Sequence, residues 1–259
     1  MAKALFFDID GTLVSFKTHN IPESTIDALT AAKNNGVDIF ISTGRPRPLI
    51  NNIQSISHLV KGYITTNGAY CFAGNQTISC APIHQEEAES LLNQSDKMGY
   101  ACIIVGEHDL AMHNPNPRAM SIFRDMLNIF NLPELPLPHM LNQNILQLTP
   151  FITPGEEQTI LPLLKNVEIS RWCNEFADIT AKGVSKAKGL KEIAEWGGYP
   201  ISDTIAFGDG GNDLTIIKAA GIGVAMGNAN PELKQAADFI TTTVDDNGIY
   251  NALRHFNVI

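Results

Sequence analysis

Apolar residues along the first eighty positions follow two alternating periods. Short continuous runs at residues 4–9, 37–42 and 63–66 have the length and composition of buried strands. Between the first two runs, residues 22–36 repeat apolar side chains at helical spacing, beginning with a proline and ending with a glycine. This alternation predicts an α/β fold with a doubly wound parallel sheet covered by helices.

Two further elements are expected before residue 82. The spacing of Leu49, Ile50 and Ile53 predicts a helix that leads into the third strand. Residues 69–80 predict a hairpin that turns at Gly74 and Asn75.

The pattern changes from about residue 83. The order of predicted elements becomes α-β-β-α-β-α-β-β, at residues 86–99, 100–106, 110–113, 118–130, 145–152, 156–165, 167–173 and 176–180. The proline-rich segment 131–144 is the longest irregular piece and is expected to be a surface connection. Strands paired through tight turns predict an antiparallel sheet with helices, so residues 83–182 are expected to form an inserted α+β domain.

The alternating pattern then returns. Residues 183–259 predict helices at 185–198, 212–221 and 231–237, a closing helix after residue 246, and strands at 204–209 and 222–226. Residues 1–82 and 183–259 are therefore expected to form one α/β core that the second domain interrupts.

Composition restricts the partners and the compartment. A net charge of -9 disfavours a polyanionic ligand, so we expect no nucleic-acid partner. No apolar run approaches the roughly 20 residues that span a bilayer, and the first run meets Asp8 too early for a signal peptide. Four widely spaced cysteines indicate a reducing compartment. We expect a cytoplasmic protein with no membrane partner, as a monomer or small homo-oligomer.

Polar residues gather where elements of the α/β core end. Ligands of open α/β sheets bind beside the carboxyl ends of the strands, which makes each cluster a candidate. The clusters are Asp8 with Asp10, Ser42 to Arg45, Asn67 with Gly68, Lys186 or Lys188, and Gly208 to Asp213.

In this order the segments DIDGTLV, STGR, TNGA, GVSK and FGDGGNDL resemble the motifs of the haloacid dehalogenase (HAD) superfamily. The likeness is to its Cof-like branch, in which a type IIB cap domain interrupts a Rossmann-like core. The resemblance implies a phosphatase of small phosphorylated metabolites, above all sugar phosphates, with a cap that closes over the site. The predicted insert has the architecture that this cap implies.

The resemblance also implies roles for single residues. Asp8 would attack phosphorus to form an aspartyl phosphate, and Asp10 would protonate the leaving oxygen and later activate water. On an extended segment the two side chains would point to the same side. Thr43 would hold phosphoryl oxygens, and Lys186 would neutralise charge on nucleophile and phosphate.

A carboxylate that attacks a phosphate monoester needs cations to offset the repulsion between the two anions. Asp8, Asp209 and the backbone carbonyl of Asp10 would hold Mg²⁺, which prefers oxygen ligands. Asp213 would be a further ligand or would hold a metal-bound water. Further contacts to the phosphorylated small-molecule substrate are expected from Gly11, Gly44, Arg45, Asn67 and Asn212.

Each cluster also has a purely structural interpretation. Asp8 and Asp10 could end a strand in a turn, Asp209 and Asp213 could cap a helix, Thr43 could cap the next helix, and Arg45 could pair with a surface acid. Lys188 competes with Lys186 for the basic position. Polar residues of the insert, His113, Arg118, Asn174 and Glu175, are more often solvated or already paired than part of a site.

Two other functions stay open. A phosphomutase or phosphotransferase would share the aspartyl phosphate and pass the group to a sugar hydroxyl instead of water. A non-catalytic module that binds phosphorylated metabolites is disfavoured, because a pure binder gains nothing from placing a carboxylate against an anion.

Overall fold

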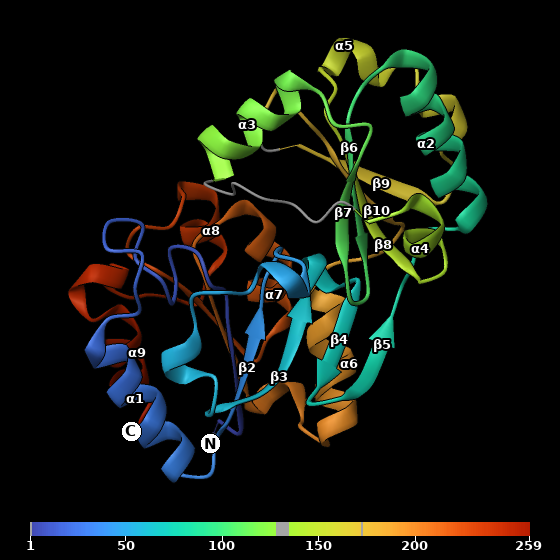
Figure 1. The fold of residues 1–259 in the computed structure, drawn as a ribbon. Helices are drawn as coiled ribbons and strands as arrows, with labels where there is room; N and C mark the ends of the chain where they lie inside the picture. The colour runs from blue at the N-terminus through green and yellow to red at the C-terminus, as the bar shows by residue number, and fades with distance from the viewer. Residues whose placement is uncertain (1, 128–134, 172) are drawn as a thin grey trace. The chain divides into compact units, whose positions relative to one another are not determined.

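The computed structural model describes residues 2–127, 135–171 and 173–259 of the chain (Figure 1). The chain divides into two compact units. The first comprises residues 1–80 and 184–259, here called the core unit, and the second comprises residues 81–183, here called the inserted unit. Each unit has its own sheet, so each is described by itself.

The core unit contains an eight-stranded sheet in the order β13-β12-β11-β1-β2-β3-β4-β5. The strands from β13 to β3 run parallel, and β4 and β5 add an antiparallel hairpin at one edge. The bounds are β1 (Ala4–Phe7), β2 (Asp38–Ser42), β3 (Val60–Thr65), β4 (Tyr70–Ala73), β5 (Gln76–Cys80), β11 (Thr204–Gly208), β12 (Ile222–Ala225) and β13 (Phe239–Ile240). Because β1 pairs in parallel with both β2 and β11, the residues that follow these three strands emerge at one edge of the sheet.

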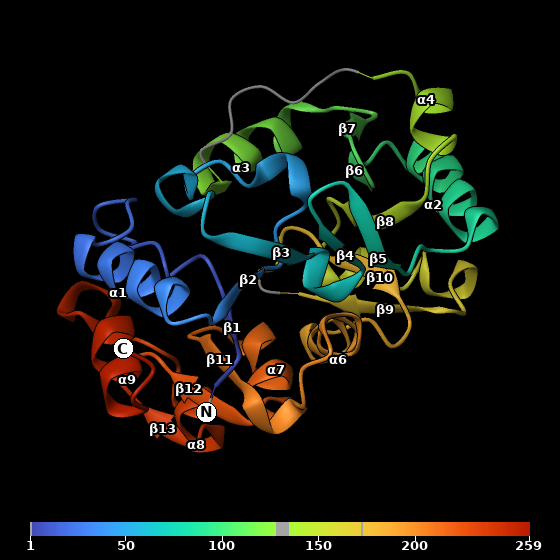
Figure 2. The same ribbon diagram turned by 90° about the horizontal axis from the view of Figure 1, so that it is seen from below.

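Helices cover both faces of this sheet (Figure 2). Alternate residues of β1 point to opposite faces, as a strand requires. Leu5 and Phe7 pack with apolar residues of α1 (Glu23–Asn34) and α9 (Gly248–His255). Ala4 and Phe6 pack in a second core with residues of α6 (Lys186–Gly197), α7 (Leu214–Ala219) and α8 (Pro231–Ala236). The apolar run of β1 is thus buried on both sides, and polar residues can follow only at its ends.

The inserted unit contains a five-stranded antiparallel sheet in the order β7-β6-β8-β10-β9. Its strands are β6 (Cys102–Gly106), β7 (Leu110–His113), β8 (Ile145–Pro150), β9 (Val167–Ser170) and β10 (Asp178–Ala181). Its helices are α2 (Gln85–Met98), α3 (Pro117–Leu127), α4 (Leu137–Leu141) and α5 (Pro154–Glu157). Leu91 of α2 packs with Ile104, Leu148 and Ile179 of three strands in one apolar cluster. The expected α/β core with an inserted α+β sheet is confirmed.

Two predicted helices are wrong. The helix expected through Leu49 and Ile53 is replaced by separate 3₁₀ turns at Arg47–Leu49 and Gln54–Ile56. Pro46 and Pro48 lack the amide donors that a longer helix needs there. The helix expected at 156–165 is likewise split, because α5 ends at Glu157 and only a 3₁₀ turn at Leu161–Leu163 follows. Pro162 lies inside that turn and would interrupt a continuous helix.

Three other predictions fall partly on residues that are not described. The segment 131–144, expected to be irregular, contains helix α4, and its residues 131–134 lie outside the described part. The predicted helix 118–130 matches α3 up to Leu127, and the predicted strand 167–173 matches β9 up to Ser170. Residues 128–130 and Trp172 are again outside. Within the described ranges, none of the helices combines the length and apolar character that crossing a bilayer requires.

Candidate active site

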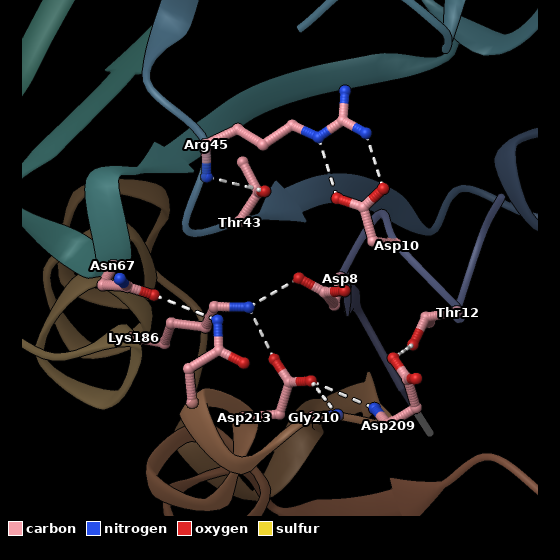
Figure 3. A network of polar contacts seen from close by, with 11 residues as sticks. Asp8, Asp10, Thr12, Thr43, Arg45, Asn67, Lys186, Asp209, Gly210 and Asp213 are labelled. Carbon is pink, nitrogen blue, oxygen red and sulfur yellow. Dashed lines mark hydrogen bonds and ion pairs between the residues drawn. The ribbon is translucent and has the colours of Figure 1, made fainter. Parts of the chain in front are cut away.

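A buried lysine joins two carboxylates at the carboxyl edge of the core sheet (Figure 3). Asp8 directly follows β1, Lys186 is the first residue of α6, and Asp213 ends the 3₁₀ turn Gly211–Asp213 after β11. Lys186 Nζ donates to Asp8 Oδ1 at 2.6 Å and to Asp213 Oδ1 at 2.5 Å. Asp8 is 7% exposed, and Lys186 and Asp213 are each 1% exposed. Burial opposes the charge on Lys186, but the carboxylates of Asp213 and Asp8 outweigh burial and raise the pKa of Lys186.

Asp213 is held by the backbone of its own loop. Its second oxygen, Oδ2, accepts from the backbone N–H of Asp209 at 3.0 Å and of Gly210 at 2.9 Å. Gly208 permits this approach, because a Cβ there would lie 2.5 Å from the Cβ of Asp213. Asp213 therefore makes no side-chain cap to α7, but these bonds at the start of the 3₁₀ turn fix the carboxylate that faces Lys186.

Three carboxylates converge beside this lysine. One oxygen from each of Asp8, Asp209 and Asp213 lies within 4.8 Å of the others. Burial, followed by the charge of Asp213, raises the pKa of Asp8 and raises that of Asp209 to about 7. Their ionised forms are thus unfavourable without a further cation. Crowded carboxylate oxygens are the ligands of a hard divalent ion, so the residues fit the expected metal site.

Asp10 is oriented away from this cluster. Its carboxylate forms a bidentate pair with Arg45, with Nε to Oδ2 at 2.8 Å and Nη2 to Oδ1 at 2.5 Å (Figure 3). Strand β1 ends at Phe7 and Ile9 lies in a turn, so the extended segment assumed for Asp8 and Asp10 does not form. Arg45 does pair with an acid, as its structural interpretation proposed, and that acid is Asp10.

Backbone and amide contacts connect the remaining predicted residues. Thr43 O accepts from the N–H of Asn67 at 3.1 Å, and Asn67 Oδ1 accepts from Asn212 Nδ2 at 3.1 Å. Gly44 lies against this amide, because a Cβ there would approach Asn67 Oδ1 to 2.9 Å. Thr43 Oγ1 accepts from the N–H of Arg45 at 3.1 Å, so the hydroxyl stabilises its own turn. The loops that carry Thr43, Asn67 and Asn212 are thereby joined.

The contacts of Gly11 and Lys188 explain both residues by local structure: Gly11 lies in a tight turn, and Lys188 lies on the surface of α6. Gly11 has φ +80°, its N–H donates to Val14 O at 2.9 Å, and a Cβ would lie 2.2 Å from Asp209 Oδ2. Lys188 is exposed, and its Nζ lies 3.5 Å from Glu192 of the same helix. Of the two candidate lysines, Lys186 is the one placed among the carboxylates.

Two residues at this site were missed by the sequence reasoning. Thr12 Oγ1 donates to Asp209 Oδ1 at 3.2 Å. Asn228, after β12, donates from Nδ2 to Gly11 O at 2.8 Å and to Asp209 Oδ2 at 3.3 Å. Asn228 could have been found from its position shortly after another strand of the parallel sheet, because ligands bind beside the carboxyl ends of such strands.

The polar residues considered in the inserted unit are mostly paired there. His113 lies 2.8 Å from Asp96, and Arg118 lies 3.1 Å from Glu175. These half-exposed pairs agree with the structural interpretation.

Comparison with known proteins identifies the family. The family profile of haloacid dehalogenase-like hydrolases matches residues 5–253. The putative phosphatase YkrA of Bacillus subtilis is 34% identical over 260 residues, covering 100% of this chain and 99% of that protein. The HAD subclass IIB sugar phosphatase BT4131 is 47% identical, with a TM-score of 0.87 and full coverage of both chains. BT1666 from Bacteroides thetaiotaomicron, a phosphatase of the HAD superfamily, is 34% identical, with a TM-score of 0.88 and coverage of 100% and 96%.

The chain belongs to the haloacid dehalogenase-like hydrolases. Within that superfamily it is a Cof-like, HAD-type phosphatase, a phosphoric monoester hydrolase, and phosphorylated small molecules are the substrates typical of its IIB class. The fold and family expected from the motifs are confirmed.

Proposed function

We propose that this protein is a Mg²⁺-dependent sugar phosphatase that works through an aspartyl phosphate on Asp8. The observation that carries the proposal is the buried Lys186 between Asp8 and Asp213, with Asp209 beside them. The 47% identity to a sugar phosphatase over the full chain supports the substrate class.

The first step transfers the phosphoryl group to the protein. Asp8 forms a bond from a carboxylate oxygen to phosphorus while the bond from phosphorus to the sugar oxygen breaks, and Asp10 gives its proton to that oxygen. Lys186 holds Asp8 in place and offsets the charge that the phosphate brings to the site. To act as the acid, the carboxyl group of Asp10 has to leave Arg45, which binds both of its oxygens.

The second step releases phosphate. Asp10, now ionised, takes a proton from water as the water oxygen bonds to phosphorus, and the bond between phosphorus and the Asp8 oxygen breaks. Thr43 and nearby backbone N–H groups are assigned to the phosphoryl oxygens, with Gly11, Gly44, Arg45, Asn67 and Asn212 as further contacts.

The metal would be held by the carboxylates of Asp8, Asp209 and Asp213 and by the backbone carbonyl of Asp10. When bound, Mg²⁺ would neutralise charge on the phosphate and on the crowded carboxylates. We assign magnesium because the donors are all oxygen.

Release of inorganic phosphate tests this function. Wild-type protein is assayed with hexose, pentose and triose phosphates and with nucleotides, with and without Mg²⁺, beside Asp8→Asn and the control Asp203→Asn. Asp203 lies before β11, where it forms a loose ion pair with Lys3 at 3.5 Å. We expect Mg²⁺-dependent release from sugar phosphates that Asp8→Asn alone abolishes. Transfer of phosphate to a sugar without release would instead indicate a mutase, and activity retained in Asp8→Asn would exclude the nucleophile.

A further inference from the structure

A strained turn, Thr66–Gly68, connects β3 to β4 within the core unit. Its three consecutive residues, Thr66, Asn67 and Gly68, have positive φ angles of 51°, 53° and 102°. Glycine adopts such angles readily and asparagine tolerates them, but a β-branched threonine adopts them rarely. Thr66 is also fully buried. Strain of this kind persists only where the surrounding structure imposes it, and it is concentrated at functional sites.

Hydrogen bonds fix one side of this turn to the loop that follows β2. The N–H of Thr66 donates to Arg45 O at 3.0 Å, and the N–H of Asn67 donates to Thr43 O at 3.1 Å. The N–H of Ala69 donates back to Thr66 O at 3.1 Å. Because β2 and β3 pair in parallel, these bonds hold the turn at the carboxyl edge of the core sheet.

The other side of the turn lies against the start of α6. A Cβ on Gly68 would lie 2.1 Å from Ser185 O and 3.3 Å from Lys186 N, so a larger residue does not fit there. Ser185 O accepts the hydrogen bond that begins α6, from the N–H of Gly189 at 3.1 Å. The turn therefore sets how closely the first turn of α6 approaches the edge of the sheet.

We infer that Gly68 is a positioning residue, which seats the first turn of α6 so that Lys186 reaches both of its carboxylates. The ammonium group lies 2.6 Å from Asp8 and 2.5 Å from Asp213 (Figure 3). Lys186 is 1% exposed, and close packing around its side chain limits how far the ammonium group can compensate for a displaced backbone. The inference rests on the proposed function, in which Lys186 offsets the charge of the phosphate, and it adds a residue that acts through this lysine.

Gly68→Ala adds the one atom for which this contact has no room. To reach an ordinary contact distance, Ser185 O would have to retreat by about 1 Å. A misplacement of this size costs about 100-fold in rate, so we expect kcat for p-nitrophenyl phosphate with Mg²⁺ to fall about 100-fold. KM should change less than about threefold, because the lost interaction acts mainly in the transition state.

Gly198→Ala is the matched control at the other end of the same helix. Gly198 follows α6 with φ +69°, and a Cβ there would meet no atom within 4 Å beyond its chain neighbours. The alanine therefore brings the backbone strain of a positive φ, about 1 kcal/mol, without a clash. Its kcat should stay within about twofold of the wild type, since Lys186 is not displaced.

A second readout is independent of activity and reports on Lys186 itself. Metal-free protein is treated with an amine-acylating reagent, and mass spectrometry follows the labelling of Lys186, with the exposed Lys188 as internal reference. We expect Lys186 to be labelled at least about tenfold faster in Gly68→Ala than in the wild type or in Gly198→Ala, because the displaced ammonium group leaves its carboxylates. Lys188 should react equally in all three proteins.

A kcat like that of Gly198→Ala, a loss that lies in KM alone, or unchanged labelling of Lys186 would overturn the inference. If Gly68→Ala does not fold, Thr66→Gly decides, because it loosens the same turn without adding an atom. It should lower kcat at least about threefold and speed the labelling of Lys186, and wild-type values for both would overturn the inference. Failure of the proposed function would look different. The wild type would then release no phosphate from p-nitrophenyl phosphate or any sugar phosphate, while the labelling would still test the position of Lys186.

Discussion

Replacing Lys186 by methionine tests the electrostatic balance of the site. The substitution keeps most of the side-chain volume and removes the ammonium group that lies 2.6 Å from Asp8 and 2.5 Å from Asp213. Asp213 is 1% exposed, so bulk water does not solvate its carboxylate in the folded wild type. Two carboxylates would then be buried without a cation between them.

The expected cost follows from the geometry. At 2.6 Å and an effective dielectric constant of about 20, each ion pair is worth about 6 kcal/mol before desolvation is considered. Removing one partner of a buried pair typically costs about 3–5 kcal/mol, because the stranded acid takes up a proton or draws in water. We therefore expect Lys186→Met to lower the free energy of unfolding by about 3–5 kcal/mol near pH 8 without added metal.

The cost should depend on pH. Asp8 has a raised pKa and Asp209 titrates at about 7 instead of 3.8, so between about pH 4 and pH 7 the folded chain binds more protons than the unfolded chain. These extra protons stabilise the folded state, so their contribution to the free energy of unfolding falls as pH rises through that window. Loss of Lys186 raises both pKa values further, so Lys186→Met should cost less at about pH 5.5 than near pH 8.

Urea unfolding of metal-free protein at both pH values measures the effect. Lys188→Met is the matched control. This exposed lysine pairs with Glu192 at 3.5 Å, so its replacement should cost less than about 1 kcal/mol. Equal stabilities for the two variants near pH 8, or a larger cost at low pH, would refute the reasoning.

Three further outcomes are expected. Mg²⁺ should raise the melting temperature of the wild type more near pH 8 than at about pH 5.5, and Asp209→Asn should remove most of that rise in a thermal-shift assay. Gly11→Ala should lower the free energy of unfolding by more than about 1 kcal/mol, because the new Cβ meets Asp209. For the same reason the variant should bind Mg²⁺ more weakly than the wild type when the ion is titrated. Asp10→Asn should lower kcat at least about 100-fold, because the acid that serves both steps is lost. Its free energy of unfolding should change by less than about 1 kcal/mol, because the ion pair between Asp10 and Arg45 is partly exposed.

The central strand and its acids could be predicted because the chain marks them locally. The buried run before Asp8 and the ordered motifs led to the parallel sheet, and parallel register brings Asp8 and Asp209 to one edge. Lys186, which is 178 residues from Asp8, could be placed only through the resemblance to a known family.

Other features depend on geometry that no local pattern carries. The orientation of Asp10 was missed because the strand ends at Phe7, and a turn then directs the side chain to Arg45. Asn228 is a single asparagine in a loop, and only the folded sheet places it beside Asp209. Within the inserted unit, Gln147 and Thr149 of β8 bind Asp178 of β10, a set of contacts that becomes visible only once the strands are paired.

The central claim is that Asp8 carries the phosphoryl group during turnover. Wild-type protein is mixed with a radiolabelled sugar phosphate and Mg²⁺, quenched in acid within one turnover, and digested to locate the label. We expect a base-labile phosphate on the peptide that contains Asp8, and no label on that peptide in Asp8→Asn. Release of phosphate by the wild type with no label on that peptide at any quench time would contradict the account.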